Sequence, residues 1–116
     1  MSLTLPLIAL GGAVGSTLRY LMVSAIGAPL GTAAVNVLGS FAIGVLFILL
    51  GSRESWQFLL MAGLLGGFTT FSAFSLDTLT IWERGEPVSA FLYVAVSVLV
   101  SLAAIVAGLA VARSFA

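Results

Sequence analysis

Four long apolar runs joined by very short turns limit what this chain can fold into. The runs cover about 3–25, 32–51, 56–82 and 88–112, and the turns between them hold Pro29, Arg53, Glu54 and Glu83–Pro87. A helix needs about 20 apolar residues to cross a bilayer, and short connections force neighbouring helices to run antiparallel. Because 61% of the 116 residues are hydrophobic and 7% are charged, the sequence predicts one all-α membrane domain with four transmembrane helices.

The third run is longer than one crossing requires. As a helix, its residues would reach about 40 Å, whereas the hydrocarbon core is about 30 Å thick. Gly66 and Gly67 lie near its middle and are followed by several hydroxyl residues. A broken membrane helix is tolerated only where protein buries the break, where it binds an ion or where it lines a wet path. We predict a break at Gly66–Gly67 with the helix resuming near Phe71 or Ser72; the alternative is one long, tilted helix.

Several classes of chemistry need residues that this chain lacks. It contains no His, Cys or Lys, which excludes thiol chemistry, imidazole bases, Schiff bases and soft-metal sites. Its four Arg residues are scattered and the net charge is zero, so no nucleic-acid partner is expected. We expect a multi-pass protein of the cell inner membrane or plasma membrane that is not an enzyme.

The positive charges give no preferred orientation. Arg53 and Arg113 fall on the side of the N-terminus, whereas Arg19 and Arg84 fall on the opposite side. Membrane topology follows the excess of Lys and Arg in the flanking turns, and here the count is tied. The tie predicts insertion in both orientations, and we hypothesise an antiparallel, dual-topology homodimer.

Polar and small residues recur at helical spacing on three of the runs. Close helix packing is the plain explanation for the glycines, whereas Asn36 is either a clasp between helices or a donor aimed at a passing ion. The hydroxyl ladder of the fourth run suits stepwise replacement of an ion's hydration shell. These stripes are Gly12, Gly15, Ser16 and Arg19 on the first run, Thr32, Asn36, Ser40 and Gly44 on the second, and Tyr93, Ser97 and Ser101 on the fourth.

The balance of donors and acids favours an anion. Asp77 is the one acid predicted inside a span, where Arg19 adds a positive charge and amide and hydroxyl donors are plentiful. Phe71 and Phe74 share a helix face, and the positive edges of their rings can touch an anion, although ordinary core packing explains the same spacing. Arg19 is expected to pair with Asp77 or a carbonyl, or to extend to the interface; Asp77 alternatively caps a turn.

Three motifs together resemble the CrcB/Fluc family of fluoride channels. They span three of the four helices in the family's order, with Phe68, Ala73 and Asp77 standing where members often have Leu, Thr and Glu. The motifs are Gly12-x-x-Gly15-x-x-x-Arg19-Tyr20, Gly31-Thr32-x-x-Val35-Asn36-x-x-Gly39-Ser40-Phe41 and Gly63-x-x-Gly66-Gly67-Phe68-Thr69-Thr70-Phe71-Ser72-x-Phe74.

The resemblance implies a dual-topology homodimer with two antiparallel fluoride pores that export fluoride passively. It implies a pore-facing donor at Asn36, with Thr32 near the path, and an aromatic box of Phe71 and Phe74. It also implies a structural, non-transported Na⁺ at the dimer centre. The matching polar track is Tyr93, Ser97 and Ser101, and the matching sodium ligands are the backbone carbonyls of Gly66 and Thr69.

Two other functions remain open at this point. A small proton-coupled multidrug efflux transporter has a similar length and four antiparallel spans, but it needs a carboxylate in its first span, where this chain has Arg19 and no acid. An accessory subunit without transport activity would need only the Gly and Ala stripes. Asn36 and the hydroxyl ladder speak against that second alternative.

Overall fold

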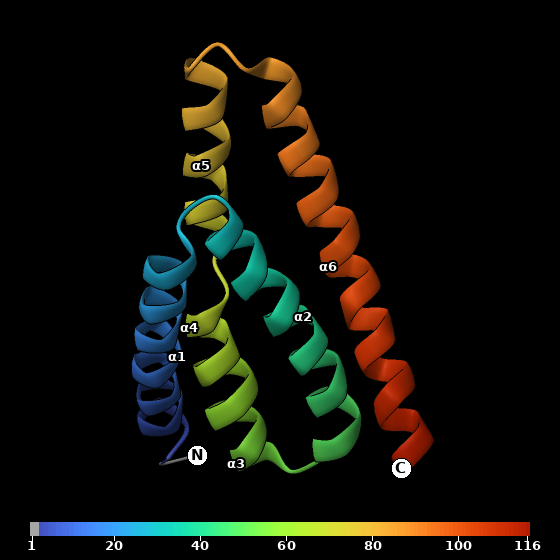
Figure 1. Ribbon diagram of the computed structural model, residues 1–116. Coiled ribbons are helices and arrows are strands. Elements are labelled where there is room, and N and C mark those ends of the chain that lie inside the picture. The colour runs from blue at the N-terminus through green and yellow to red at the C-terminus, as the bar shows by residue number, and fades with distance from the viewer. Residues whose placement is uncertain (1–2) are drawn as a thin grey trace.

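A computed structural model describes residues 3–116, and every regular element in that range is a helix (Figure 1). Four helical spans are long and apolar enough to cross a membrane, so the predicted all-α membrane architecture is confirmed. In chain order the elements are α1 (Thr4–Ile26), α2 (Leu30–Leu50), α3 (Glu54–Trp56), η1 (Gln57–Leu65), α4 (Gly66–Phe68), α5 (Phe71–Glu83) and α6 (Pro87–Phe115). The third span comprises α3 to α5.

The turns between spans are short because each contains a glycine in a backbone conformation that side chains disfavour. Gly27, Gly51 and Gly85 have φ angles of 91°, 51° and 81°. A positive φ lets the chain reverse within a few residues at no steric cost to glycine. Successive spans therefore run antiparallel, as the short connections predicted.

The third span is broken near its middle, but the predicted position of the break was wrong. Gly66 and Gly67 belong to the helical turn α4, and the extended residues are Thr69 (ψ 157°) and Thr70 (φ −152°, ψ 120°). The helix resumes at Phe71, as predicted. The half before the break also winds as a π-helix over Gln57–Leu65, which the sequence did not indicate. Single-turn π-bulges are the common form, so a π segment of this length is unusual.

Glycines form the contact between α1 and the first half of the third span. We call Gly11 and Gly15 of α1, with Gly63 and Gly67 of the third span, the glycine seam. A β-carbon on Gly67 would lie 2.6 Å from the Gly12 carbonyl oxygen, and one on Gly15 would lie 2.9 Å from the Phe68 nitrogen. The backbones approach too closely for any side chain, so the packing explanation is confirmed for Gly15. It does not hold for Gly12, where a β-carbon would meet no atom nearer than 3.9 Å.

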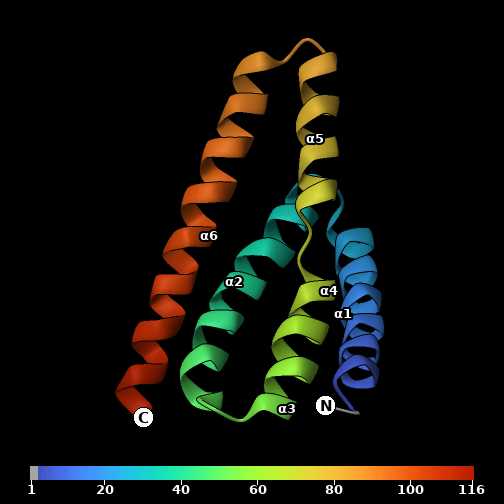
Figure 2. The same ribbon diagram turned by 180° about the vertical axis from the view of Figure 1, so that it is seen from behind.

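The spans form a lower group of helices and an upper hairpin. Figures 1 and 2 show α1, α2 and the first half of the third span side by side, while α5 and the start of α6 rise beyond them. The lower half of α6 packs along α2, where a β-carbon on Gly44 would lie 2.6 Å from the Ile105 carbonyl oxygen. Helix α5 packs chiefly on α6, and it exposes Phe71, Leu76, Leu79 and Trp82.

Candidate functional site

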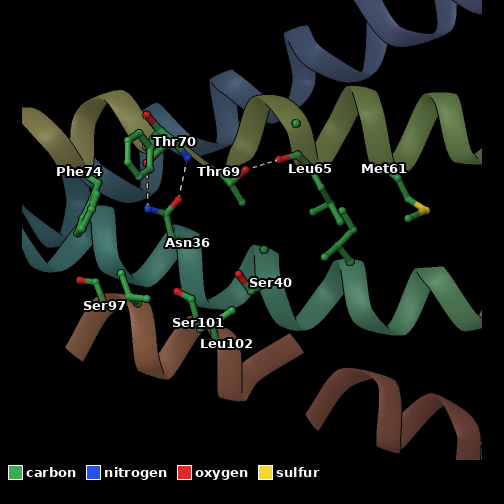
Figure 3. A pocket seen from close by; sticks show the side chains of 15 residues that line it. Asn36, Ser40, Met61, Leu65, Thr69, Thr70, Phe74, Ser97, Ser101 and Leu102 are labelled. Carbon is green, nitrogen blue, oxygen red and sulfur yellow. Dashed lines mark hydrogen bonds between the residues drawn. The ribbon is translucent and has the colours of Figure 1, made fainter. Parts of the chain in front are cut away.

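The break in the third span is held by one side chain of α2. The Asn36 amide nitrogen donates to the Thr70 carbonyl oxygen at 2.9 Å, and the Thr70 amide nitrogen donates to the Asn36 side-chain oxygen at 2.7 Å (Figure 3). Because a backbone N–H can only donate, the amide oxygen must face it, which fixes the orientation of the side chain. Asn36 is therefore a clasp between helices, and one N–H of its amide is left for another acceptor.

Thr70 also starts the second half of the span. Its hydroxyl accepts a hydrogen bond from the Ala73 amide at 3.1 Å, and its backbone is extended, as at a helix N-cap. Sequence reasoning missed this role, although a threonine directly before a helical run is a known start signal. Gly39 was missed as well: a β-carbon there would overlap the Thr69 methyl group, so glycine makes room for the break.

Several carbonyl groups at the break lose the donors that a continuous helix would give them, and those of Gly66 and Thr69 are two of these. The amide of Thr70, four residues after Gly66, donates to Asn36. The amide of Ala73, four residues after Thr69, donates to the Thr70 hydroxyl. Helical carbonyls normally accept from the amide four residues on. The oxygens of Gly66 and Thr69 thus have acceptor capacity for a ligand from outside the helix.

An open pocket of about 400 Å³ lies beside the break and is drawn in Figure 3. It is formed by α2, both halves of the third span and α6, and none of its lining residues carries a charge. Its polar groups are amides, hydroxyls and backbone, contributed chiefly by Asn36, Ser40, Thr69, Thr70, Ser97 and Ser101. The pocket offers neutral hydrogen-bonding groups surrounded by apolar side chains.

The α6 hydroxyls of this pocket are not used by the protein itself. Ser97 is only 6% exposed, yet neither Ser97 nor Ser101 takes part in any side-chain hydrogen bond within residues 3–116. By contrast, the hydroxyls of Ser75, Thr78 and Thr80 on α5 bond their own helix. The two α6 hydroxyls are therefore free to bind a ligand.

Aromatic rings border the site on the α5 side. The ring centroids of Phe71 and Phe74 are 5.6 Å apart, and those of Phe74 and Tyr93 are 5.4 Å apart. Both phenylalanines line the pocket, but Phe74 is 9% exposed and Phe71 is 78% exposed. The first is held among α5 and α6 side chains, whereas the second is largely uncovered.

The remaining predicted residues gather around Tyr93. Its hydroxyl donates to an Asp77 carboxylate oxygen at 3.4 Å, and Thr32, which is fully buried, faces the same hydroxyl. The predicted pairing of Arg19 with Asp77 is not formed; within residues 3–116 the ion pair is Arg84 with Glu86. Tyr93 lines a second pocket rather than the first, and Ser97 lines both. The structure therefore brings the predicted polar residues of the second, third and fourth spans into one region, whereas Ser16 and Arg19 of the first span lie outside it.

Four apolar spans around an uncharged, hydrogen-bonding pocket define a multi-pass membrane protein. The family model described as CrcB-like protein, Camphor Resistance (CrcB), matches residues 6–109. The chain belongs to this family, which confirms the resemblance seen in the motifs.

Close relatives cover nearly the whole chain. A protein of Rhizobium etli (strain CIAT 652) is 50% identical over 120 residues, covering 95% of this chain and 96% of its own. One of Paracoccus denitrificans is 51% identical over 113 residues, 91% of each chain, and one of Cereibacter sphaeroides (strain ATCC 17029) is 47% identical over 117 residues, 93% of each. All three are named fluoride-specific ion channel FluC.

Proposed function

We propose that this protein is a fluoride-selective channel that lets fluoride leave the cell passively across the inner or plasma membrane. The observation that carries the proposal is the identity of about half of all residues, over nearly the full chain, with proteins named fluoride-specific ion channels. Such a channel is an ion conduit and not an enzyme.

The chemistry of the site supports an anion of high hydration energy. Fluoride leaves water only where donors replace its shell, and a row of donors allows this to happen in steps. Asn36 keeps one free N–H, Ser97 and Ser101 keep free hydroxyls, and the pocket beside them is lined by no carboxylate. The edges of the Phe71 and Phe74 rings add positive character along the same path.

The working unit in this proposal is an antiparallel homodimer. The tied count of arginines favours both orientations, and α5 leaves Phe71, Leu76 and Trp82 exposed at 78%, 65% and 59%. An inverted copy would cover this part of α5 and complete the aromatic border of the pocket, where Phe71 is otherwise bare.

A structural sodium ion belongs to the same proposal. Carbonyls of a broken membrane helix are known ligands for Na⁺, and the Gly66 and Thr69 oxygens are two whose helical donors bond side chains instead. These oxygens fit a hard cation, which would hold the two breaks together at the dimer centre and would not be transported.

Liposomes test the function directly. Vesicles containing the purified protein and potassium fluoride are diluted into fluoride-free buffer, valinomycin is added, and external fluoride is followed with a selective electrode. We expect rapid fluoride efflux, with none from protein-free vesicles and no chloride efflux from chloride-loaded ones. Folded protein that releases no fluoride contradicts the proposal and directs attention to proton-coupled transport of organic cations.

A further inference from the structure

A second pocket, of about 420 Å³, lies where the α5–α6 turn approaches the start of α2. Its walls include Leu30 and Ala33 of α2, Ile81 at the end of α5, and Leu92 of α6. Ser97 lines both this pocket and the first. The Ser97 side chain thus lies between the uncharged site beside the break and a cavity at the end of the bundle.

Ser97 carries an unused hydroxyl between the two pockets. It is buried to more than nine-tenths and takes part in no side-chain hydrogen bond within residues 3–116. Yet in that range no side-chain polar atom is both fully buried and without a partner. Its oxygen therefore remains accessible from the cavity. Ser89 and Tyr93 line the second pocket at four-residue intervals before Ser97, so hydroxyls continue along one face of α6 toward the turn.

Arg84 and Glu86 are the charged residues that line the second pocket. The Arg84 Nε and Glu86 Oε2 atoms are 3.5 Å apart, with 59% and 50% of the two side chains exposed. An ion pair this exposed contributes little to stability. The pair instead affects the electrostatic potential at the pocket, where the negative charge of Glu86 largely cancels the positive charge of Arg84.

We propose that the second pocket is an entrance for the anion, that Arg84 concentrates anions there, and that Glu86 weakens this attraction. The inference rests on the proposed function and goes beyond it by assigning the charges that control entry. A unit charge ~10 Å away across water changes the local concentration of a monovalent anion about twofold. Walls of low polarity increase that effect.

The test compares initial fluoride efflux from zwitterionic phosphatidylcholine vesicles at fluoride concentrations well below saturation. In about 10 mM of an impermeant salt, where the Debye length is about 30 Å, Glu86→Gln is expected to raise the efflux rate about twofold and Arg84→Gln to lower it about twofold. The double variant is expected to match the parent. Glu54→Gln, which removes the same charge from the opposite end of the helical bundle and does not line the pocket, is the matched control (Figure 1).

Salt concentration distinguishes an electrostatic effect of the two charges from a structural effect of the substitutions. In about 1 M salt the Debye length is about 3 Å, so both single variants should return to the parent rate. Equal rates for parent and both variants at low salt, or changes in the same direction for both, overturn the inference while leaving the channel function intact. A parent protein without fluoride efflux overturns the proposed function itself, and this inference with it.

Discussion

At the scale of single residues, Asn36 determines the geometry of the site. Its amide supplies one acceptor and one donor to the backbone of Thr70, two of the groups that the break leaves without helical partners. Leaving a buried donor or acceptor unpaired costs about 1–3 kcal/mol. The Asn amide offers both functions in one planar group that stays neutral at every pH in the physiological range.

The variant Asn36→Asp tests this dual role through its dependence on pH. An ionised carboxylate accepts from the Thr70 amide but cannot donate to the Thr70 carbonyl, whereas a protonated carboxyl does both. We expect a loss of about 1–3 kcal/mol above neutrality that diminishes as the pH falls and the carboxyl gains its proton. Thermal unfolding in detergent across this pH range measures it.

Two other variants serve as controls for this experiment. Asn36→Leu cannot make either hydrogen bond, so its deficit should not change with pH. Ser40→Ala, one turn further along α2 and without a side-chain hydrogen bond in the described residues, should unfold with the parent. A constant deficit in Asn36→Asp at every pH would contradict the reciprocal pair.

The sequence identified Asn36 as a residue of interest but could not choose between its roles. Spacing on a helix tells which face a side chain occupies, and not which group it meets 34 residues further along the chain. The same limit explains Asp77, for which pairing with Arg19 and capping a turn both stayed open and whose observed partner is Tyr93. Asp77 and Tyr93 were both among the predicted residues. Which residue each one contacts is seen only in the three-dimensional structure.

At the scale of elements, the third span combines π-helical, α-helical and extended backbone within one crossing. The sequence predicted that it is broken and that it resumes near Phe71 or Ser72, because its length and its hydroxyls are unusual for a membrane helix. The break was placed at Gly66–Gly67 since glycine weakens helices. In this protein Gly67 instead permits close contact with α1, and a propensity scale does not distinguish these two uses of glycine.

The proposed sodium site is a property of this broken element. If Na⁺ binds the freed carbonyls of Gly66 and Thr69, exchanging it thoroughly for a bulky cation such as N-methyl-D-glucamine should lower fluoride flux and loosen the dimer. Size-exclusion chromatography and the liposome assay measure the two effects, and restoring Na⁺ should reverse them. Unchanged flux and unchanged dimer in Na⁺-free conditions would remove the ion from the proposal.

At the scale of the whole molecule, the lower helices and the upper hairpin differ in how completely they are packed. The lower group has the glycine seam and the α2–α6 contact, whereas α5 has α6 as its main neighbour (Figure 2). The four spans and their antiparallel order followed from hydropathy and turn length. The uneven packing did not, because it depends on where the break directs α5.

Dual topology can be tested with single cysteines, since the chain has none of its own. Ala116→Cys and Glu83→Cys place thiols near opposite membrane faces, and both positions are exposed. Equal insertion in two orientations predicts that an impermeant thiol reagent outside intact cells labels about half of each variant, with the rest labelled after permeabilisation. Complete labelling of one variant and none of the other would establish a single orientation.

The glycine seam has a consequence for how such a chain can change over generations. At each of its four positions a β-carbon would lie within about 3 Å of a backbone atom of the facing helix, so even a single added methyl group must push two spans apart. Most of the large apolar side chains, by contrast, face outward and touch little of the protein. Substitutions during evolution should therefore accumulate on the exposed apolar surface. Where α1 meets the third span, almost no residue other than glycine can be accepted.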